Sequence, residues 1–421
     1  MVIARSVRGM NDLFESDLVK FRQIERALHR VFHAFGYQEI RTPILEELAL
    51  FKRSVGETSD IVEKEMFLVE DGEHTYCMRP EYTAPVVRAL IERGGISDDM
   101  QEKLYYVGPM FRKERPQKGR LRQFHQFGVE LFGISDASAD IEIIVMVHHL
   151  FAELNLAHLV KLKINSLGQS DERQQYKSIL RDFFKNHVAS LCQDCQRRIV
   201  SNPLRVLDCK NSPCHEIAQR APKILETLNE ESRRHFDSVL SGLVRENVPF
   251  EIDEYLVRGL DYYNRTVFEF LADTGLGSQN AVAAGGRYDG LFLTLGNKID
   301  LPAIGCAGGI ERMVMLLGHQ EACDGHPIDI ALVFADDQGQ SAAMELAFAL
   351  RRLGKAVDFS LIKKSVKAQM RRGDKLKAKF VAVLGEQEIQ RKRVVIKGLV
   401  EKSSHELALD AQTIAQFLNT N

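Results

Sequence analysis

The chain has 421 residues, 45% of them hydrophobic and 27% charged, which is enough for two or three domains with a sizeable core. It contains no apolar run of the roughly 20 residues that a membrane-spanning helix needs, no apolar signal segment in its first eleven residues, and only seven scattered cysteines. This composition excludes an integral membrane protein and a small disulfide-bonded domain, and we expect a cytoplasmic protein.

The net charge of −2 conceals an uneven distribution. Between Arg351 and Lys397 there are fifteen Lys or Arg against four Asp or Glu, a local charge of +11 that leaves −13 on the rest of the chain. Such a basic segment is a candidate polyanion-binding surface, although a lysine-rich domain without that function would have the same composition.

The first predicted element is an amphipathic helix over residues 17–35, because apolar residues recur at helical spacing and stop at Gly36, a plausible C-cap. The following segment, Tyr37–Leu45, has the composition of a strand. Pro43 cannot donate to a strand ladder, so we expect this strand to lie at a sheet edge or at a subunit contact.

The segment Tyr76–Arg88 is predicted to run from a short strand through Pro80 into a helix. Glu81 and Thr83 lie at this junction, where a carboxylate and a hydroxyl could hold an ammonium group. An ordinary helix start, with the same two residues as caps, explains the pattern equally well.

A hairpin is predicted for Leu104–Phe132, where two alternating apolar runs flank a basic loop that contains Pro116 and Gly119. From Arg112 to Arg122 this loop carries six cations and one carboxylate, Glu114. A solvated hairpin with a charged tip would show the same pattern.

Strand parity in this hairpin predicts the floor of a pocket. Side chains alternate faces along a strand, so four residues of the second strand share one face: Phe124, Gln126, Gly128 and Glu130. On the first strand the same parity groups Met110, Arg112 and Glu114.

A helix over 139–154 and a strand over 159–166 are followed by a polar, helical stretch over 169–247, interpreted as a helical insertion in the strand-rich body. The insertion contains a C-x2-C-x13-C-x4-C pattern close to the spacing of structural zinc sites: Cys192, Cys195, Cys209 and Cys214. Neither flank has the turn glycines of a zinc ribbon, and unliganded thiols are the alternative.

Strand character returns over 248–270, and this run includes Arg258 and Tyr263. Because these two residues have opposite parity, both can face one pocket only if the chain turns near Gly259 to Asp261.

Next, Ala283–Leu291 is predicted to be a glycine-rich turn that carries Tyr288, and Ile304–Met313 a strand that leads through glycines into a helix with Glu311 and Arg312. The glycine spacing matches neither a dinucleotide fingerprint nor a Walker loop.

Residues 318–329 have the composition of a linker, after which short β runs at 330–334, 356–359, 380–384 and 394–396 alternate with helical stretches such as 340–353. This pattern predicts a small α/β domain with a parallel or mixed sheet.

Five of these segments, in order, resemble the histidyl-tRNA synthetase family, whose members are class II aminoacyl-tRNA synthetases. GPMFRKERPQKGRLRQFHQFGVE is similar to the second class-defining motif, IGCAGGIERM to the third and residues 36–46 to the first, while RGLDYYNR and AAGGRYDGL resemble the two signatures specific to histidine. The resemblance implies an α+β fold: a class II antiparallel-sheet catalytic domain (1–325) with the helical insertion (169–247), followed by an α/β anticodon-binding domain (328–421).

The same resemblance implies a histidine–tRNA ligase that uses ATP and Mg²⁺ to form histidyl-adenylate and then charges tRNA(His), acting as a homodimer without membrane contact. Arg112 and Arg258 would bind the α-phosphate as the catalytic cations, and Arg258 would also meet the substrate carboxylate. Glu114 would support ATP, and Phe124 and Arg312 would enclose the adenine. The histidine would be held by Glu81, Thr83 and Gln126 at its ammonium group, by Glu130 and Tyr263 at its ring nitrogens, and by Tyr288 in the pocket wall.

Three positions depart from the family pattern: Tyr82 and Asn280 stand where glycine is usual, and Cys306 where an aromatic residue is usual. Tyr82 adds bulk beside Glu81, which bears on the shape of that corner. Two other functions are considered, a catalytically silent regulatory paralogue and a nucleic-acid-binding protein that uses only its basic half. Retention of Arg112, Arg258 and Arg312 argues against the first, and the predicted pocket face argues against the second.

Overall fold

The computed structural model describes residues 4–56, 61–258, 262–273, 275–276, 280–318, 328–399 and 401–420. The chain separates into two compact units, residues 1–321 and 322–421. Among the described residues, no helix combines the length and the apolar composition that crossing a bilayer requires.

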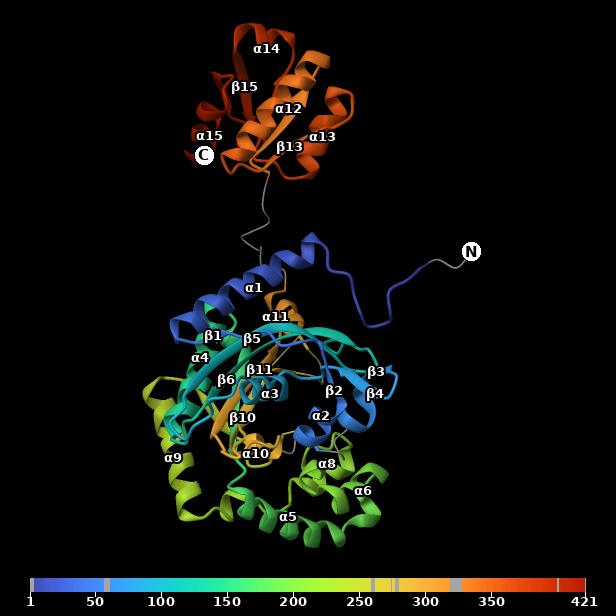
Figure 1. Cartoon of the computed structure of the whole chain (residues 1–421), viewed down its shortest axis with the longest axis vertical. Coiled ribbons are helices and arrows are strands. Elements are labelled where there is room, and N and C mark those ends of the chain that lie inside the picture. Colours follow the sequence, from blue (N-terminus) through green and yellow to red (C-terminus); the bar gives the residue numbers. More distant parts are fainter. Residues whose placement is uncertain are drawn as a thin grey trace. The chain divides into compact units, whose positions relative to one another are not determined.

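The first unit is built on a mostly antiparallel sheet of eight strands (Figure 1). In spatial order its strands are β1 (Gln38–Glu39), β5 (Glu102–Phe111), β6 (Gln123–Phe132), β11 (Ala303–Gly309), β10 (Ala281–Arg287), β9 (Asn264–Ala272), β7 (Val160–Ser166) and β8 (Phe250–Ile252). Only the outer pairs β1/β5 and β7/β8 are parallel. A second, three-stranded sheet comprises β2 (Leu45–Glu47), β4 (His74–Met78) and β3 (Phe67–Asp71).

Helices cover both faces of the large sheet. One face packs against α1 (Glu15–Ala34), α4 (Ala137–Glu153), α9 (Glu230–Arg245) and α11 (Ile310–Leu317). The other face carries α3 (Thr83–Arg93), α10 (Leu291–Thr294) and the helices α5 (Ser170–Lys185), α6 (Gln193–Ser201), α7 (Leu204–Leu207) and α8 (Ser212–Ala218). The remaining elements are α2 (Leu48–Val55), the π-helical turn 61–65 and three 3₁₀ turns at 157–159, 188–190 and 224–226.

The predicted hairpin is confirmed as β5 and β6, joined by the loop 112–122, with Tyr106 opposite Gly128 and Leu104 opposite Glu130. Odd-numbered residues of β6, such as Val129, pack on the α1 side, and Phe132 packs on the other side, as the alternation requires. The predicted helices at 17–35 and 139–154, the strand at 159–166 and the helical run at 169–247 are also confirmed.

The prediction of a single strand over Tyr37–Leu45 is wrong, because β1 and β2 belong to different sheets. Between them, the guanidinium group of Arg79 donates to the carbonyl oxygens of Thr42 (2.7 Å) and Pro43 (3.2 Å). These carbonyls therefore find a side-chain donor where a ladder would have used a backbone N–H.

The prediction of a glycine-rich turn over Ala283–Leu291 is also wrong for its first half, since residues up to Arg287 form β10. Glycine is needed in this strand for close packing: a Cβ on Gly285 would lie 2.2 Å from the carbonyl oxygen of Gly305 on β11. The strand predicted over 248–270 is divided into β8 and β9. The predicted turn at 259–261 and most of the predicted linker, residues 319–327, lie outside the described residues.

The second unit is the predicted small α/β domain. Its mixed sheet has the order β13 (Val357–Phe359), β12 (Ile330–Phe334), β14 (Phe380–Leu384), β15 (Arg393–Gly398) and β16 (Ser404–Ala408). Helices α12 (Asp337–Arg352) and α15 (Ala411–Thr420) bury one face, α13 (Val366–Lys375) packs on the other, and α14 (Glu386–Arg391) connects β14 to β15. Each unit thus has its own hydrophobic core.

Candidate active site

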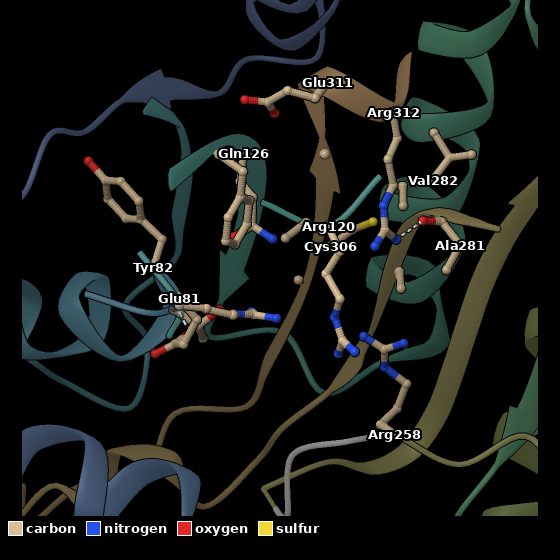
Figure 2. Close-up of a pocket in the computed structure, with 18 of the residues that line it drawn as sticks. Glu81, Tyr82, Arg120, Gln126, Arg258, Ala281, Val282, Cys306, Glu311 and Arg312 are labelled. Carbon is tan, nitrogen blue, oxygen red and sulfur yellow. Dashed lines mark hydrogen bonds between the residues drawn. The ribbon is translucent and has the colours of Figure 1, made fainter. Parts of the chain in front are cut away.

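A cavity opens on the face of the large sheet that carries α3 (Figure 2). Its lining comes from the turn before α3, the hairpin β5–β6 with its loop, the central strands β11 and β10, the segment around Tyr262, and the start of α11. Ten of the predicted site residues line it: Glu81, Thr83, Arg112, Glu114, Phe124, Gln126, Arg258, Tyr263, Tyr288 and Arg312. The exceptions are Glu130, which lies beneath the lining, and the four cysteines of the insertion.

Four arginines converge on this cavity: Arg112, Arg120, Arg258 and Arg312. The Nε of Arg112 donates to the carbonyl oxygen of Pro80 (2.9 Å), and the Nε of Arg312 donates to that of Gly119 (3.0 Å). Figure 2 shows Arg120, Arg258 and Arg312 directed into the cavity from different elements. Each contact leaves much of the five-donor guanidinium group available to a ligand.

The pKa values show the electrostatic cost of this arrangement. Burial, together with the charges of Arg112 and Arg120, lowers the pKa of Arg312 to about 10. The pKa of Arg112 is also lowered, chiefly by burial and in part by Arg258. Four cations held together in a partly buried cavity favour the binding of a polyanion, which would relieve their mutual repulsion.

Arg258 differs from Arg112 and Arg312 in that neighbouring acidic groups compensate for its burial. Its guanidinium group forms an ion pair with Glu269 and lies 5.4 Å from the centre of the Tyr263 ring. Burial alone would lower its pKa, but Tyr263 and Glu269 outweigh burial and raise the pKa of Arg258. Arg258 is therefore a permanent cation with a fixed position.

Glu81 both caps α3 and lines the cavity. Its carboxylate accepts the backbone N–H groups of Thr83 (2.7 Å) and Ala84 (3.1 Å). Burial raises the pKa of Glu81, and the two backbone hydrogen bonds oppose that rise. The capping role and the site role considered for this junction are thus compatible.

Glu130 lies under one end of the cavity, with 1% of its surface exposed. Three hydroxyl groups donate to its carboxylate: Tyr288 to Oε2 at 2.5 Å, and Thr83 and Tyr106 to Oε1 at 2.8 and 3.3 Å. Burial raises the pKa of Glu130 to about 8, although these hydrogen bonds act in the opposite direction. The three hydroxyl groups separate the carboxylate from the cavity.

The polar and aromatic lining of β6 follows the predicted parity. Phe124 and Gln126 face the cavity, and the guanidinium group of Arg112 lies 5.3 Å from the centre of the Phe124 ring. A Cβ on Gly128 would lie 2.1 Å from the hydroxyl oxygen of Tyr106, so glycine makes room for that tyrosine. Glu114 forms an ion pair with Arg120 at the loop end.

The three departures from the family pattern leave the charged groups in place. The ring of Tyr82 stacks on Tyr106 (4.0 Å between centroids), and Figure 2 shows it pointing away from the arginines. The side chain of Cys306 packs in the core on the α1 side of the sheet, and the carbonyl oxygen of Asn280 accepts the N–H of Ala272 (2.8 Å).

Several lining residues were not predicted from the sequence, notably Tyr106, Arg120, Tyr262 and Glu311. The parity that groups Gly128 with Glu130 also places Tyr106 on the same face, because Tyr106 pairs directly with Gly128, so strand register could have found it. Nothing in the sequence distinguishes Arg120 from the other cations of its loop. Glu311 accepts the backbone N–H of His125 at 2.9 Å and braces β6.

An internal ion pair supports the Tyr288 side of the cavity. Arg287, fully buried, donates to the carboxylate of Asp140 on α4 (2.5 Å) and to the carbonyl oxygen of Ile134 (2.9 Å). This pair fastens the end of β10 to the helix layer and thereby positions the adjacent Tyr288.

Comparison with known proteins agrees with this geometry. A family model described as "Histidyl-tRNA synthetase" matches residues 9–313, and one described as "Anticodon binding domain" matches residues 327–417. The histidine–tRNA ligase of Geobacter sulfurreducens is 44% identical over 97% of this chain and 98% of its own length, and that of Geobacillus kaustophilus is 42% identical over 98% and 97%. The crystal structure of apo histidyl-tRNA synthetase from S. aureus superposes with a TM-score of 0.81 at 33% identity, covering 99% of this chain and all of that one. With residues 9–313 and 327–417 matched by these models and full-length relatives above 40% identity, the chain belongs to the histidyl-tRNA synthetase family.

Proposed function

We propose that this protein activates L-histidine with ATP, releasing pyrophosphate, and then transfers the histidyl group from the adenylate to the 3′ end of tRNA(His). The observation that carries the proposal is the convergence of four arginines in one cavity whose far end is a buried carboxylate ringed by hydroxyl groups. The first feature suits a nucleoside triphosphate, and the second suits a polar ring that donates a hydrogen bond.

At the nucleotide end, we assign the α-phosphate to Arg112 and Arg258. Negative charge builds on the phosphoryl oxygens as the histidine carboxylate attacks the α-phosphorus, so cations fixed there stabilise the transition state. Phe124 and Arg312 line the same cavity and would enclose the adenine between an aromatic face and a guanidinium plane. Arg258 would also meet the carboxylate of histidine before attack.

Mg²⁺ is expected to accompany ATP. The carboxylate of Glu114 lies inside the cavity among these arginines, and carboxylate oxygens are suitable ligands for Mg²⁺. When bound, the ion would neutralise charge on the phosphates.

At the amino-acid end, Glu81, Thr83 and Gln126 are assigned to the α-ammonium group. The imidazole is assigned to Glu130, Tyr263 and Tyr288, because a neutral imidazole offers one donor and one acceptor. Since the carboxylate of Glu130 already accepts hydrogen bonds from three hydroxyl groups, one of these hydrogen bonds must break before Glu130 can contact the ring N–H directly. The hydrogen bond from Tyr106 is the longest of the three, at 3.3 Å, and we expect the imidazole to displace it.

The second unit is assigned to the anticodon stem and loop of tRNA(His). Of the fifteen basic residues between Arg351 and Lys397, all except the half-buried Lys355 are exposed, so the excess positive charge lies at the surface. Phosphate contacts of this kind give affinity that depends on salt.

We propose that the protein forms a homodimer and that exposed apolar residues near β2 and β3 lie in the interface. Ile44, Leu45, Leu68 and Val69 are between 39% and 54% exposed. A second copy of the chain would cover such a patch. A cytoplasmic location is proposed with it, since tRNA charging supplies protein synthesis.

The decisive test is ATP–pyrophosphate exchange measured with each of the twenty amino acids. Exchange with histidine alone is the expected result, because only its side chain combines a ring donor and acceptor. No exchange with histidine, in protein that still binds ATP, would support the regulatory alternative. Charging of tRNA(His) transcripts then tests the transfer step separately.

A further inference from the structure

The helical insertion contains a cluster of thiols that the proposed catalysis does not use. Its members are Cys192 at the N-cap of α6, Cys195 in the first turn of α6, Cys209 after α7 and Cys214 in α8. Their four sulfur atoms all lie within 4.8 Å of one another, although the residues span 23 positions in the sequence. Cys195, Cys209 and Cys214 are buried, and Cys192 is partly exposed.

The spacing of the sulfur atoms matches a tetrahedral metal site better than it matches disulfides. With a Zn–S distance of about 2.3 Å, the edge of an ideal ZnS₄ tetrahedron is about 3.8 Å. The Sγ atoms of Cys192 and Cys209 are 4.0 Å apart, whereas a disulfide requires about 2.05 Å. All four cysteines carry free thiols in this structure.

The surroundings also suit thiolate ligands. The backbone N–H of Cys192 donates to the Sγ of Cys214 at 3.2 Å, the type of contact that orients and stabilises a metal-bound thiolate. Four thiolates around Zn²⁺ carry a net charge of −2. The segment 192–214 contains four Arg or Lys and two Asp, an excess of two positive charges that balances it.

From this geometry we propose that Cys192, Cys195, Cys209 and Cys214 bind one Zn²⁺ ion that cross-links α6, α7 and α8. These helices have only nine, four and seven residues, and helices so short are not stable alone. A closed four-cysteine site leaves no coordination position for a substrate, so the ion is structural. It organises the insertion without touching the ATP cavity, since no cysteine of the cluster lines that cavity.

The first experiment measures metal in the full chain, purified without chelators or metal-affinity resin, by elemental analysis and native mass spectrometry. We expect about one zinc per chain in the parent and less than about a tenth in Cys195→Ser and Cys214→Ser. Cys77→Ser is the matched control, because Cys77 is also buried but lies in a different core cluster, and it should keep its zinc. Absence of metal in the parent, iron in place of zinc, or zinc retained by both cluster variants would overturn the assignment.

A second measurement covers the case in which the variants fail to fold. Cobalt exchanged into the parent protein should give intense thiolate-to-cobalt charge-transfer bands and the visible bands of a tetrahedral site. Hydrogen exchange should then show faster exchange confined to residues 192–218 when zinc is removed from the parent by a chelator. A cobalt spectrum typical of octahedral oxygen ligands, or unchanged protection of these helices after zinc removal, would contradict the proposal.

Discussion

Two regions of the molecule concentrate positive charge, and they do so in opposite ways. In the cavity that we assign to ATP, four arginines are held by fixed acceptors such as the carbonyl oxygens of Pro80 and Gly119. On the second unit, the basic residues of α13 and its flanks are exposed, and in the ion pair of Lys363 with Asp337 both side chains are exposed. Placing a charged group in the first region costs desolvation free energy, whereas an exposed charge in the second region keeps its hydration and costs almost none.

The two regions should therefore bind anions in different ways: the cavity by the fixed positions of its arginines, and the second unit by the summed attraction of many exposed charges. A buried guanidinium group of fixed orientation stabilises one particular charge distribution, such as the negative charge on the α-phosphate oxygens in the transition state of adenylate formation. An exposed lysine attracts any nearby phosphate and is screened by salt. Substitutions in the cavity should therefore have large effects specific to one step, and substitutions on α13 should have small, cumulative effects on tRNA binding.

The largest expected effect comes from Arg258→Lys, which keeps the charge but removes the planar fork of donors. Histidine activation should fall by about 10²- to 10³-fold in kcat/KM, measured by pyrophosphate exchange. Arg265→Lys is the matched control, since Arg265 pairs with Glu231 on α9 and does not line the cavity; its activity should stay close to the parent. Equal losses in both variants would mean that Arg258 acts only through folding.

Glu130→Gln tests the carboxyl end of the same cavity. Above about pH 8 Glu130 is ionised, and a charge-assisted hydrogen bond to the imidazole is then worth roughly 1.5 to 3 kcal/mol, so kcat/KM for histidine measured at about pH 9 should fall by about one to two orders of magnitude. ATP binding, measured separately by calorimetry, should hardly change. If this variant matched the parent while Tyr263→Phe lost activity, Glu130 would serve only to hold its three hydroxyl donors.

The same variant should change how stability depends on pH. With a pKa of about 8 in the folded protein, Glu130 stays protonated between about pH 5 and 8, while it ionises in the unfolded chain. Folding stability should therefore fall as the pH rises through this range, by about 1.4 kcal/mol per unit from this group. In Glu130→Gln the dependence should be correspondingly shallower, and parallel denaturation profiles for the two proteins would contradict the raised pKa.

Sequence reasoning succeeded where one strong local pattern decided the outcome. The alternation along β6 correctly placed Phe124 and Gln126 on the cavity face, and the glycines before Arg312 correctly marked the step from β11 into α11. It failed at Ala283–Arg287, because glycine usually indicates a turn, whereas here it permits close contact between central strands. The depth of Glu130 beneath its hydroxyl groups depends on residues 24 to 158 positions away, which no local pattern could supply.

The smallest expected effect belongs to single charges on α13. Lys367 and Arg371 are both exposed on this helix, and each neutralised phosphate contributes about 0.7 to 0.9 to the slope of log K against log salt. Lys367→Ala and Arg371→Ala should each weaken tRNA binding about two- to fivefold and reduce that slope by about one unit or less, with histidine activation unchanged. Arg393→Ala, in the same basic segment, should weaken tRNA binding less than either, because the guanidinium group of Arg393 already lies 3.4 Å from a carboxylate oxygen of Glu406. A loss larger than tenfold from one α13 variant, with the salt slope preserved, would show that this surface recognises tRNA by fixed geometry, as we propose for ATP in the cavity. The distinction between the two regions would then fail.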